Sequence, residues 1–96
     1  MFLLNFTVTF SSHREKVVGT NKVLNKQLKI TLQKLALNPK HPSLHSHKVD
    51  TLTYGSRWSS SVTGDIRIIW DYDSENRLII LLLDIGGHSG THKVYK

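Results

Sequence analysis

The sequence has no cysteine, only two prolines and only seven acidic residues among 96. Without cysteine, disulfides and thiolate metal sites are excluded, and this absence fits a reducing cytoplasm. Apolar runs are also short, and none reaches the length of a membrane span. The opening MFLLNFTVTF is apolar but lacks a basic leader region, so we expect a strand there rather than a secretion signal. We therefore expect a cytoplasmic protein with no membrane partner.

Basic residues are abundant where acidic ones are scarce. Thirteen Lys and Arg give a net charge of +6 and a pI near 9.9. Seven lysines and no acid lie between Lys16 and Lys48, whereas six of the seven acids lie between Asp50 and Asp84. A basic half of this kind attracts a polyanion, which is a nucleic acid, an anionic surface or an acidic protein. The alternative explanation for the basic residues is that they only keep the protein soluble and bind no partner.

The first third of the chain predicts a strand followed by helices. Phe2–Phe10 has the composition of a strand. Ser12, followed three residues later by Glu15, forms a capping box that predicts a helix start, and leucines at helical spacing follow. We expect Gly19–Asn21 to divide this region into a short and a long helix. Asn38 ends it, because a residue that precedes proline avoids the helical region.

After the helices the apolar spacing changes to a period of two, which is typical of strands. Four strands are predicted, at Leu44–Leu52, Arg57–Gly64, Asp65–Asp73 and Arg77–Gly86. The polar turn DSEN favours an antiparallel hairpin between the last two. We therefore expect an α+β fold with an N-terminal strand, one or two helices and a four-strand antiparallel meander, with the helices packed on one face of the sheet. The whole chain, residues 1–96, is expected to be this single domain.

Two histidines and a lysine near the second predicted strand are candidates for a site. His45 and His47 are two residues apart, so on a strand they share a face, while Lys48 points the other way. Zinc bound by HPSLHSH and by HSGTH is a competing hypothesis. The lack of cysteine and of an acidic third ligand disfavours it.

Arg67 lies between core positions in the middle of its predicted strand. An arginine in such a place is rarely fully buried without a partner. Two explanations are open: an ion pair with Asp65 or Asp84, or an anion site in a concave sheet.

The tail DIGGHSGTHKVYK directly follows the most apolar run, LIILLL. Four polar or titratable residues lie in it: His88, His92, Lys93 and Tyr95. Its glycines let the backbone bend sharply, which would bring Tyr95 near His88. We expect this tail to form one wall of a site opposite His47 and Arg67.

Together these groups suit the cleavage of RNA without a metal or other cofactor. Histidine can take the 2′-OH proton or protonate the leaving 5′-oxygen. Arginine can hold the phosphate and stabilise the charge that grows on it. Tyrosine can donate a proton or stack on a base. The sequence has no P-loop, no G-x-S-x-G motif and no cysteine nucleophile.

Three segments, LALNPKHPSLHSHKVD, RWSSSVTGDIRIIWDYD and LIILLLDIGGHSGTHKVY, resemble in order and spacing the RelE/ParE toxin superfamily. Within it they are most similar to the RelE/StbE and YafQ-like mRNA interferases of bacterial type II toxin–antitoxin systems. The resemblance covers Leu35–Tyr95. It implies an antiparallel sheet with helices on one side and ribosome-dependent cleavage of mRNA to a 2′,3′-cyclic phosphate. It also implies a cognate antitoxin that wraps the toxin and through which alone the toxin would meet operator DNA.

The resemblance also implies roles for single residues. His47 and Lys48 contact phosphate or transfer a proton, and Arg67 binds phosphate. His88 is catalytic, and Tyr95 stacks on or orients a nucleotide. The expected catalytic residues are His47, Arg67, His88 and Tyr95. The expected substrate-binding residues are His45, Lys48, His92 and Lys93.

The sequence departs from the family pattern in the tail and in one strand. Seven positions separate His88 from Tyr95, so His92 is an alternative to His88. Serines stand between Ser59 and Val62, where relatives often carry a base. Two alternatives to the nuclease remain: a ParE-like toxin that binds DNA gyrase without cleavage, and an inactive relative that only binds an antitoxin. Gyrase-binding relatives generally lack the convergent His and Tyr, so the tail favours the nuclease.

Overall fold

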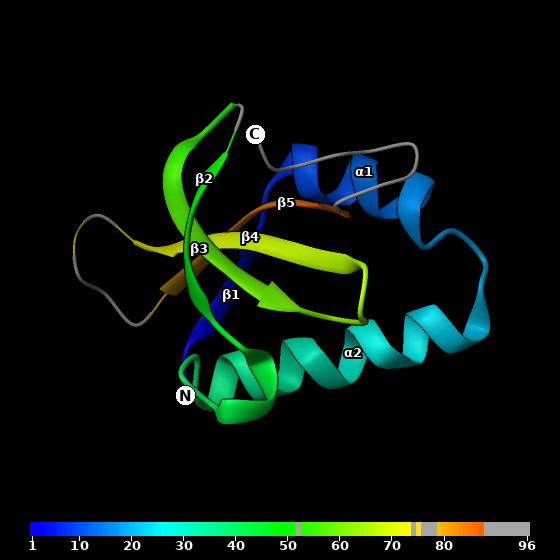
Figure 1. The fold of residues 1–96 in the computed structure, drawn as a ribbon, viewed down its shortest axis with the longest axis horizontal. Coiled ribbons are helices and arrows are strands. Elements are labelled where there is room, and N and C mark those ends of the chain that lie inside the picture. The colour runs from blue at the N-terminus through cyan, green and yellow to red at the C-terminus, as the bar shows by residue number, and fades with distance from the viewer. Residues whose placement is uncertain (52, 74, 76–78, 88–96) are drawn as a thin grey trace.

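The computed structural model describes residues 1–51, 53–73, 75 and 79–87. Five strands in these residues form one sheet: β1 (Leu3–Phe6), β2 (His47–Thr51), β3 (Gly55–Ser61), β4 (Ile66–Tyr72) and β5 (Ile79–Gly87). Two α-helices and one short 3-10 helix lie between β1 and β2: α1 (Val8–Val17), α2 (Lys22–Leu37) and η1 (Pro42–Leu44) (Figure 1).

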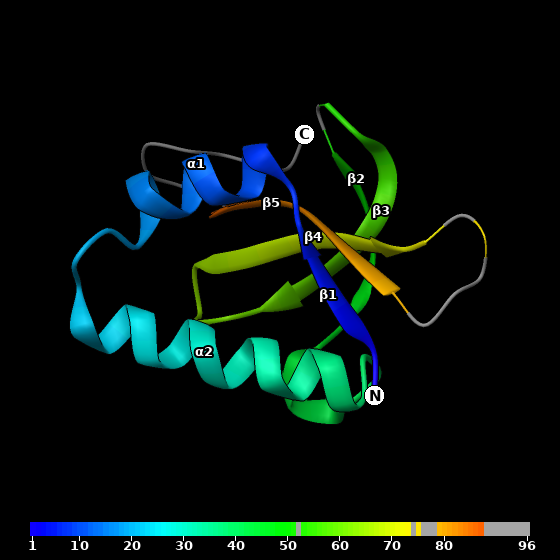
Figure 2. The same ribbon diagram turned by 180° about the vertical axis from the view of Figure 1, so that it is seen from behind.

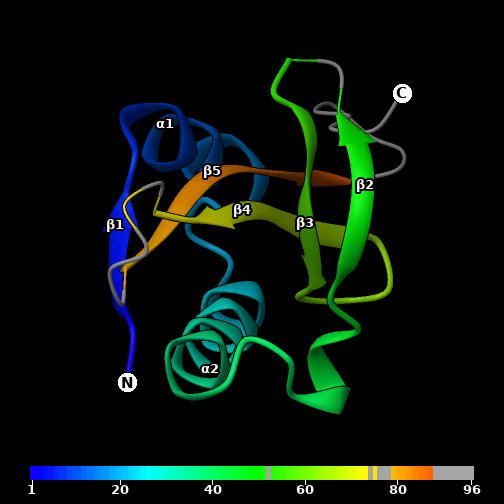
Figure 3. The same cartoon turned by 90° about the vertical axis from the view of Figure 1, so that its left-hand side faces the viewer.

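The order of the strands across the sheet is β1-β5-β4-β3-β2. The strands β2 to β5 form an antiparallel meander, and β1 lies parallel to β5, with Leu3 opposite Ile79 (Figure 2). A parallel neighbour requires a long connection, which the helices and the meander supply. The strands β2 and β3 are strongly rotated relative to β4 and β5, so the sheet coils (Figure 3). The predicted α+β fold is confirmed.

The helix α1 begins five residues earlier than the sequence predicted. The predicted strand Phe2–Phe10 ends at Phe6, and Thr7 is the N-cap of α1. The Thr7 hydroxyl accepts a hydrogen bond from the backbone N–H of Phe10 and donates one to the carbonyl of Leu82. One side chain therefore starts the helix and attaches it to β5, whereas Ser12 lies inside α1.

The helix α2 begins and ends where the sequence predicted. The Asn21 side chain accepts a hydrogen bond from the N–H of Leu24, which caps the first turn. Gly19 adopts a φ of 54°, a left-handed conformation that glycine tolerates best. This conformation interrupts the helical backbone between α1 and α2. Asn38 caps the C-terminus before Pro39. Within the described residues, no helix is both long enough and apolar enough to cross a membrane.

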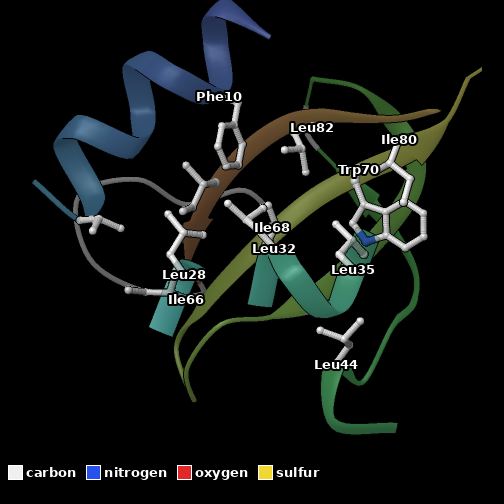
Figure 4. Packing of buried hydrophobic residues seen from close by; sticks show 12 residues of the cluster. Phe10, Leu28, Leu32, Leu35, Leu44, Ile66, Ile68, Trp70, Ile80 and Leu82 are labelled. Carbon is white, nitrogen blue, oxygen red and sulfur yellow. The ribbon is translucent and has the colours of Figure 1, made fainter. Parts of the chain in front are cut away.

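Both helices and the sheet contribute to one apolar core (Figure 4). Its fully buried members include Phe10 of α1, Leu28 and Leu35 of α2, and Ile68 and Trp70 of β4. Trp70 is the largest of them, and its indole N–H donates a hydrogen bond to Ser60 Oγ at 2.8 Å. The helices therefore pack on the face of the sheet that carries this core, as predicted. The other face carries polar residues and a smaller apolar cluster, in which Ile69 packs against Val49, Tyr54 and Leu83.

A β-bulge interrupts the pairing between β4 and β5. Ile69 pairs with Asp84 and Trp70 pairs with Leu82, so Leu83 has no partner in the register. An extra residue in one strand reverses the alternation of side chains beyond it. Leu82 and Ile85 both point into the core, although they are three residues apart. Asp84 is consequently turned to the face opposite α2, where Ile69 also lies.

Candidate functional site

A row of four side chains crosses the face of the sheet opposite α2, which is called the open face below and which α1 borders beside β5. The register pairs His47 with Ser59, Ser59 with Ile69, and Ile69 with Asp84. Directly opposed residues on neighbouring strands project from the same face. Ser59, Ile69 and Asp84 are buried, while His47 is exposed. The row therefore runs from an accessible imidazole on β2 to a buried carboxylate on β5.

The buried end of the row is held by hydrogen bonds. Asp84 Oδ1 lies 2.6 Å from Nδ1 of His13, a residue of α1. The same oxygen accepts the backbone N–H of Ile85 at 2.8 Å. Only 7% of the Asp84 side chain is exposed, so these contacts replace the water that an ionised carboxylate needs.

Tyr54, in the turn between β2 and β3, meets the same carboxylate. Burial raises the pKa of Tyr54, and the negative charge of Asp84 raises it further. A hydrogen bond from Thr9 opposes these effects. The phenol therefore stays protonated at neutral pH and can donate to Asp84. Three segments far apart in sequence meet here: α1, the β2–β3 turn and β5.

At the accessible end, the ring of His47 is oriented by the backbone. Its Nδ1 lies 2.8 Å from the carbonyl oxygen of His45. A carbonyl oxygen only accepts, so Nδ1 carries the proton in this contact. In the neutral ring, Nε2 is then the acceptor and can take a proton. An unprotonated ring nitrogen is what a general base requires, and here it is Nε2.

The prediction that His45 shares a strand face with His47 is wrong. Pro42 begins the 3-10 helix η1, and His45 follows it in a left-handed conformation with a φ of 49°. The strand β2 therefore starts at His47 rather than at Leu44. The backbone of His45, through its carbonyl, is what contacts His47, and its side chain is exposed.

Lys48 points away from His47, as expected for adjacent residues of a strand. Its strand partner is Trp58, and its ammonium lies 5.2 Å from the centre of that indole ring. Lys40 lies closer, at 3.1 Å. Trp58 also stacks on Trp70 of the core, with ring centres 5.7 Å apart. The two lysines thus bring positive charge to the border between the core and the β2 edge.

Arg67 lies on the open face, two strands from His47. It pairs with the small residues Ser61 on β3 and Gly86 on β5, and the residue is partly exposed. The guanidinium donates to the carbonyl of Thr63 at 2.5 Å and approaches that of Ile66 at 3.4 Å. Strand spacing puts Arg67 roughly 12 Å from His47. The structure thus brings these two predicted residues to one face.

The four candidate residues in the tail, His88, His92, Lys93 and Tyr95, lie outside the described residues. The expectation that this tail forms one wall of the site also falls there. Among the residues that the structure does describe, no group of three or more His, Asp or Glu is arranged to hold a metal ion.

Sequence reasoning missed several residues of the open face. His13 is 71 positions from Asp84, and nothing in the sequence connects the two. Arg57 forms an ion pair with Asp71 at 3.0 Å on the same face. One signal could have found Arg57: it alternates with Ser59 and Ser61 along a strand, and alternate residues of a strand lie on the same face.

No protein-family model matches the sequence, and no curated protein matches it. Solved structures do match. A metal-bound toxin from Helicobacter pylori has a TM-score of 0.70 and 17% identity, over 92% of this chain and 96% of that chain. YafQ from Escherichia coli has a TM-score of 0.67 and 16% identity, over 91% and 93%. A chain of the toxin–antitoxin complex RelBE2 from Mycobacterium tuberculosis has a TM-score of 0.64 and 15% identity, over 90% and 96%. The fold that the resemblance implied is therefore confirmed.

Proposed function

We propose that this chain is the toxin of a type II toxin–antitoxin system and that it cleaves mRNA on the ribosome, in the cytoplasm. Three observations support the proposal. The fold is shared with toxins of such systems. The net charge is +6, which suits a polyanionic substrate. The open face carries an accessible histidine on β2 and a partly exposed arginine on β4.

The observation that carries the proposal is the contact between Nδ1 of His47 and the carbonyl oxygen of His45. With its Nδ1 proton donated to the His45 carbonyl, Nε2 accepts the proton of a ribose 2′-OH. The 2′-oxygen then forms a bond to the adjacent phosphorus, and the bond from phosphorus to the 5′-oxygen breaks. Arg67 donates to the phosphate oxygens and stabilises the negative charge that grows on them. The products are a 2′,3′-cyclic phosphate and a 5′-hydroxyl.

The leaving 5′-oxygen needs a proton from a general acid. His88 is the proposed acid, with His92 as its alternative, and Tyr95 is proposed to orient the nucleotide. Lys48 and Lys93 are proposed to bind backbone phosphates, together with His45 and His92. These roles follow the family resemblance, and mutation of each residue tests them.

Purified ribosomes with a defined mRNA provide the test of the reaction. His47→Ala should reduce the cleavage rate about 10²–10⁴-fold, as for loss of a general base. Arg67→Ala should reduce it on the order of 10²–10³-fold. His41→Ala is the matched control, because His41 is an exposed histidine of the same loop that contacts Ser43 instead of the sheet face. Equal activity in His47→Ala and wild type would remove His47 from the mechanism.

Expression in cells separates this function from its alternatives. Induction without a partner should stop growth and cut mRNA within coding regions. DNA breaks with intact mRNA would instead indicate a gyrase-binding toxin. Normal growth would indicate an inactive relative.

We further propose that cleavage needs no metal ion. Histidine and arginine supply the proton transfer and charge stabilisation that a metal would otherwise provide. Cleavage should therefore persist after chelation by EDTA under conditions that keep ribosomes intact. Loss of cleavage that zinc restores would contradict this and favour the histidine clusters as zinc ligands.

A further inference from the structure

Two arginines and two aspartates project from the strands onto the open face, and they do not pair alike. Arg57 donates to Asp71 at 3.0 Å. Asp84 instead meets His13, with 2.6 Å between Oδ1 and Nδ1. The ion pairs that the structure shows among its described residues are these two, and neither includes Arg67, whose guanidinium donates to backbone carbonyls.

The register places Arg67 and Asp84 close enough to pair. Arg67 lies opposite Gly86 across β4 and β5, and Asp84 stands two residues before Gly86. Such diagonal neighbours on one face are roughly 7–8 Å apart, within the reach of a long side chain. Glycine at position 86 puts no side chain beside the arginine. Because arginine and carboxylate form strong hydrogen-bonded ion pairs, the register alone predicts that these two residues pair.

Donors from two other segments occupy Asp84 instead. His13 belongs to α1, which packs along β5 (Figure 3), and Tyr54 belongs to the turn between β2 and β3. A carboxylate oxygen only accepts, so Nδ1 of His13 carries the proton in their contact. The phenol of Tyr54 and the backbone N–H of Ile85 also donate to Asp84. The carboxylate is therefore directed to these donors and not to the guanidinium.

We propose that His13 is a positioning residue, which keeps Arg67 available for a phosphate group because it holds Asp84 away from the guanidinium. The inference rests on the proposed function for the identity of the anion, a phosphate of RNA, and on the contacts of Asp84 for the device itself. Only 7% of the Asp84 side chain is exposed, so loss of the histidine would leave a buried acceptor short of a donor. Arg67 would then supply that donor, and the carboxylate would compete with phosphate for the same guanidinium.

A purely structural contact is the alternative. The contact does attach α1 to β5, as does the hydrogen bond from Thr7 to the carbonyl of Leu82. A contact with only this role would change the melting temperature and leave the RNA affinity of the folded protein as it is. The positioning role changes the RNA affinity, and it makes this change depend on the charge of Asp84.

The affinity for RNA provides the first test. The probe is a single-stranded RNA with 2′-O-methyl riboses, which cannot be cleaved through the 2′-oxygen, so binding is measured without the reaction. His13→Ala should raise the Kd about tenfold, near the lower end for loss of a hydrogen bond to a charged group. His13→Asn keeps an N–H donor at the δ position and should stay within about threefold of the wild type. His41→Ala is the matched control, because His41 is an exposed histidine that contacts Ser43.

The second test removes the competing carboxylate as well. His13→Ala with Asp84→Asn should return the Kd to within about threefold of the wild type, because Arg67 is released. His13→Ala with Asp50→Asn changes the net charge by the same amount at an exposed residue of β2. This control should keep the weaker binding of His13→Ala. Melting curves establish that each variant is folded at the temperature of the measurement.

A crystal structure of His13→Ala gives a readout that needs no RNA. The carboxylate of Asp84 should lie within about 4 Å of the Arg67 guanidinium, the distance of an ion pair. If His13→Ala does not fold, Tyr54→Phe replaces it, since this change removes another donor to the same carboxylate. It should also raise the Kd, and Asp84→Asn should again restore it.

Four results would overturn the inference. They are an unchanged RNA affinity in His13→Ala, equal recovery with Asp84→Asn and with Asp50→Asn, a carboxylate that stays away from Arg67 in the variant structure, and an unchanged affinity in Arg67→Ala. The last result would show that the guanidinium binds no phosphate. Absence of mRNA cleavage together with the expected affinities would contradict the nuclease and leave the role of His13 standing.

Discussion

At the scale of single residues, Asp84 depends on one irregularity of β5. Leu82 and Asp84 are two residues apart, so a regular strand would point both into the core. The unpaired Leu83 reverses the alternation, and Asp84 meets His13 and Tyr54 instead. A carboxylate at Asp84's position in a regular strand would lie among apolar side chains, at a cost of several kcal/mol.

The contact between Asp84 and Tyr54 predicts a shift that titration can measure. Asp84→Asn should lower the pKa of Tyr54 toward its ordinary value, because the neighbouring negative charge that disfavours the phenolate is removed. The pKa should remain partly raised, since burial is the larger cause. NMR of labelled tyrosine rings resolves the individual residues.

Tyr72 is the internal control in the same titration. Its pKa is raised by burial and by Asp71, so Asp84→Asn should leave it unchanged, whereas Asp71→Asn should lower it. Equal shifts of both rings in one variant would indicate a general loosening of the fold and not a local charge effect.

The raised pKa values of Tyr54 and Tyr72 also make the free energy of unfolding vary with pH in the alkaline range. Above pH 10 the unfolded chain releases its phenolic protons, while the folded chain still holds those of Tyr54 and Tyr72. The stabilisation is therefore fully present below pH 10 and is lost as the pH rises toward the folded values. Urea titrations of the wild type should give a lower free energy of unfolding above pH 10 than at neutral pH. In Tyr54→Phe with Tyr72→Phe, the fall should be smaller.

Single-residue predictions from the sequence succeeded where a regular period holds. Arg67 and Ile69 do share a face, and Lys48 does point away from His47. The turn of Asp84 to the open face was not predictable, because every position of LIILLL is apolar and the alternation shows no break. The contact of Asp84 with His13 depends on that turn and on the place of α1.

At the scale of elements, the start of α1 shows two caps in competition. The pattern of Ser12 and Glu15 fits a capping box, but Thr7 has a second partner, the carbonyl of Leu82 on β5. A cap that also bonds to the sheet gains tertiary support that a local pattern cannot show. Helices are stabilised mainly by such packing. The helix α1 is therefore capped at Thr7, five residues nearer the N-terminus than Ser12.

A pair of alanine variants distinguishes these caps. Thr7→Ala should lower the free energy of unfolding by about 1–2 kcal/mol, because it removes the cap and the bond to Leu82. Ser12→Ala should be neutral within about 0.5 kcal/mol, because Ser12 is exposed within the helix. Urea denaturation followed by circular dichroism measures both. A larger loss in Ser12→Ala than in Thr7→Ala would restore the start that the sequence predicted.

The remaining elements followed from the sequence with small shifts in their bounds. Asn21 and Asn38 limit α2 as predicted, because both act through local backbone contacts. The strand β2 starts three residues late, since η1 and the left-handed His45 occupy the preceding positions. That delay makes the His45 carbonyl, and not its ring, the group that orients His47.

At the scale of the whole molecule, positive charge lies on two separate surfaces. Arg67 and Arg57 lie on the open face, and Arg14, Lys26 and Lys29 line a groove between α1, β1 and α2. A single value of net charge hides this separation. We expect the two surfaces to contribute separately to the binding of RNA and of a protein partner.

The dependence of RNA binding on salt tests this separation. The affinity for a single-stranded RNA should fall as salt rises, with a slope of about 0.7 for each phosphate contact. Arg67→Ala should make the slope shallower by about that amount. Lys26→Gln with Lys29→Gln should leave the slope unchanged, because these lysines lie on the other side of the sheet. Fluorescence anisotropy at several salt concentrations gives both slopes, and equal effects would show that RNA spreads over both surfaces.

The parallel pairing of β1 with β5 has a consequence for how the protein folds during its synthesis. Leu3 cannot meet Ile79 until the intervening chain has been made, and at typical rates of translation this takes roughly 4–15 s. During that interval the core lacks Ile80, Leu82 and Ile85, and the carboxylate end of the open face does not yet exist. The helices are synthesised first. A partner already present in the cell can therefore meet the surface of α2 before the nascent chain has completed the face that the proposed cleavage uses.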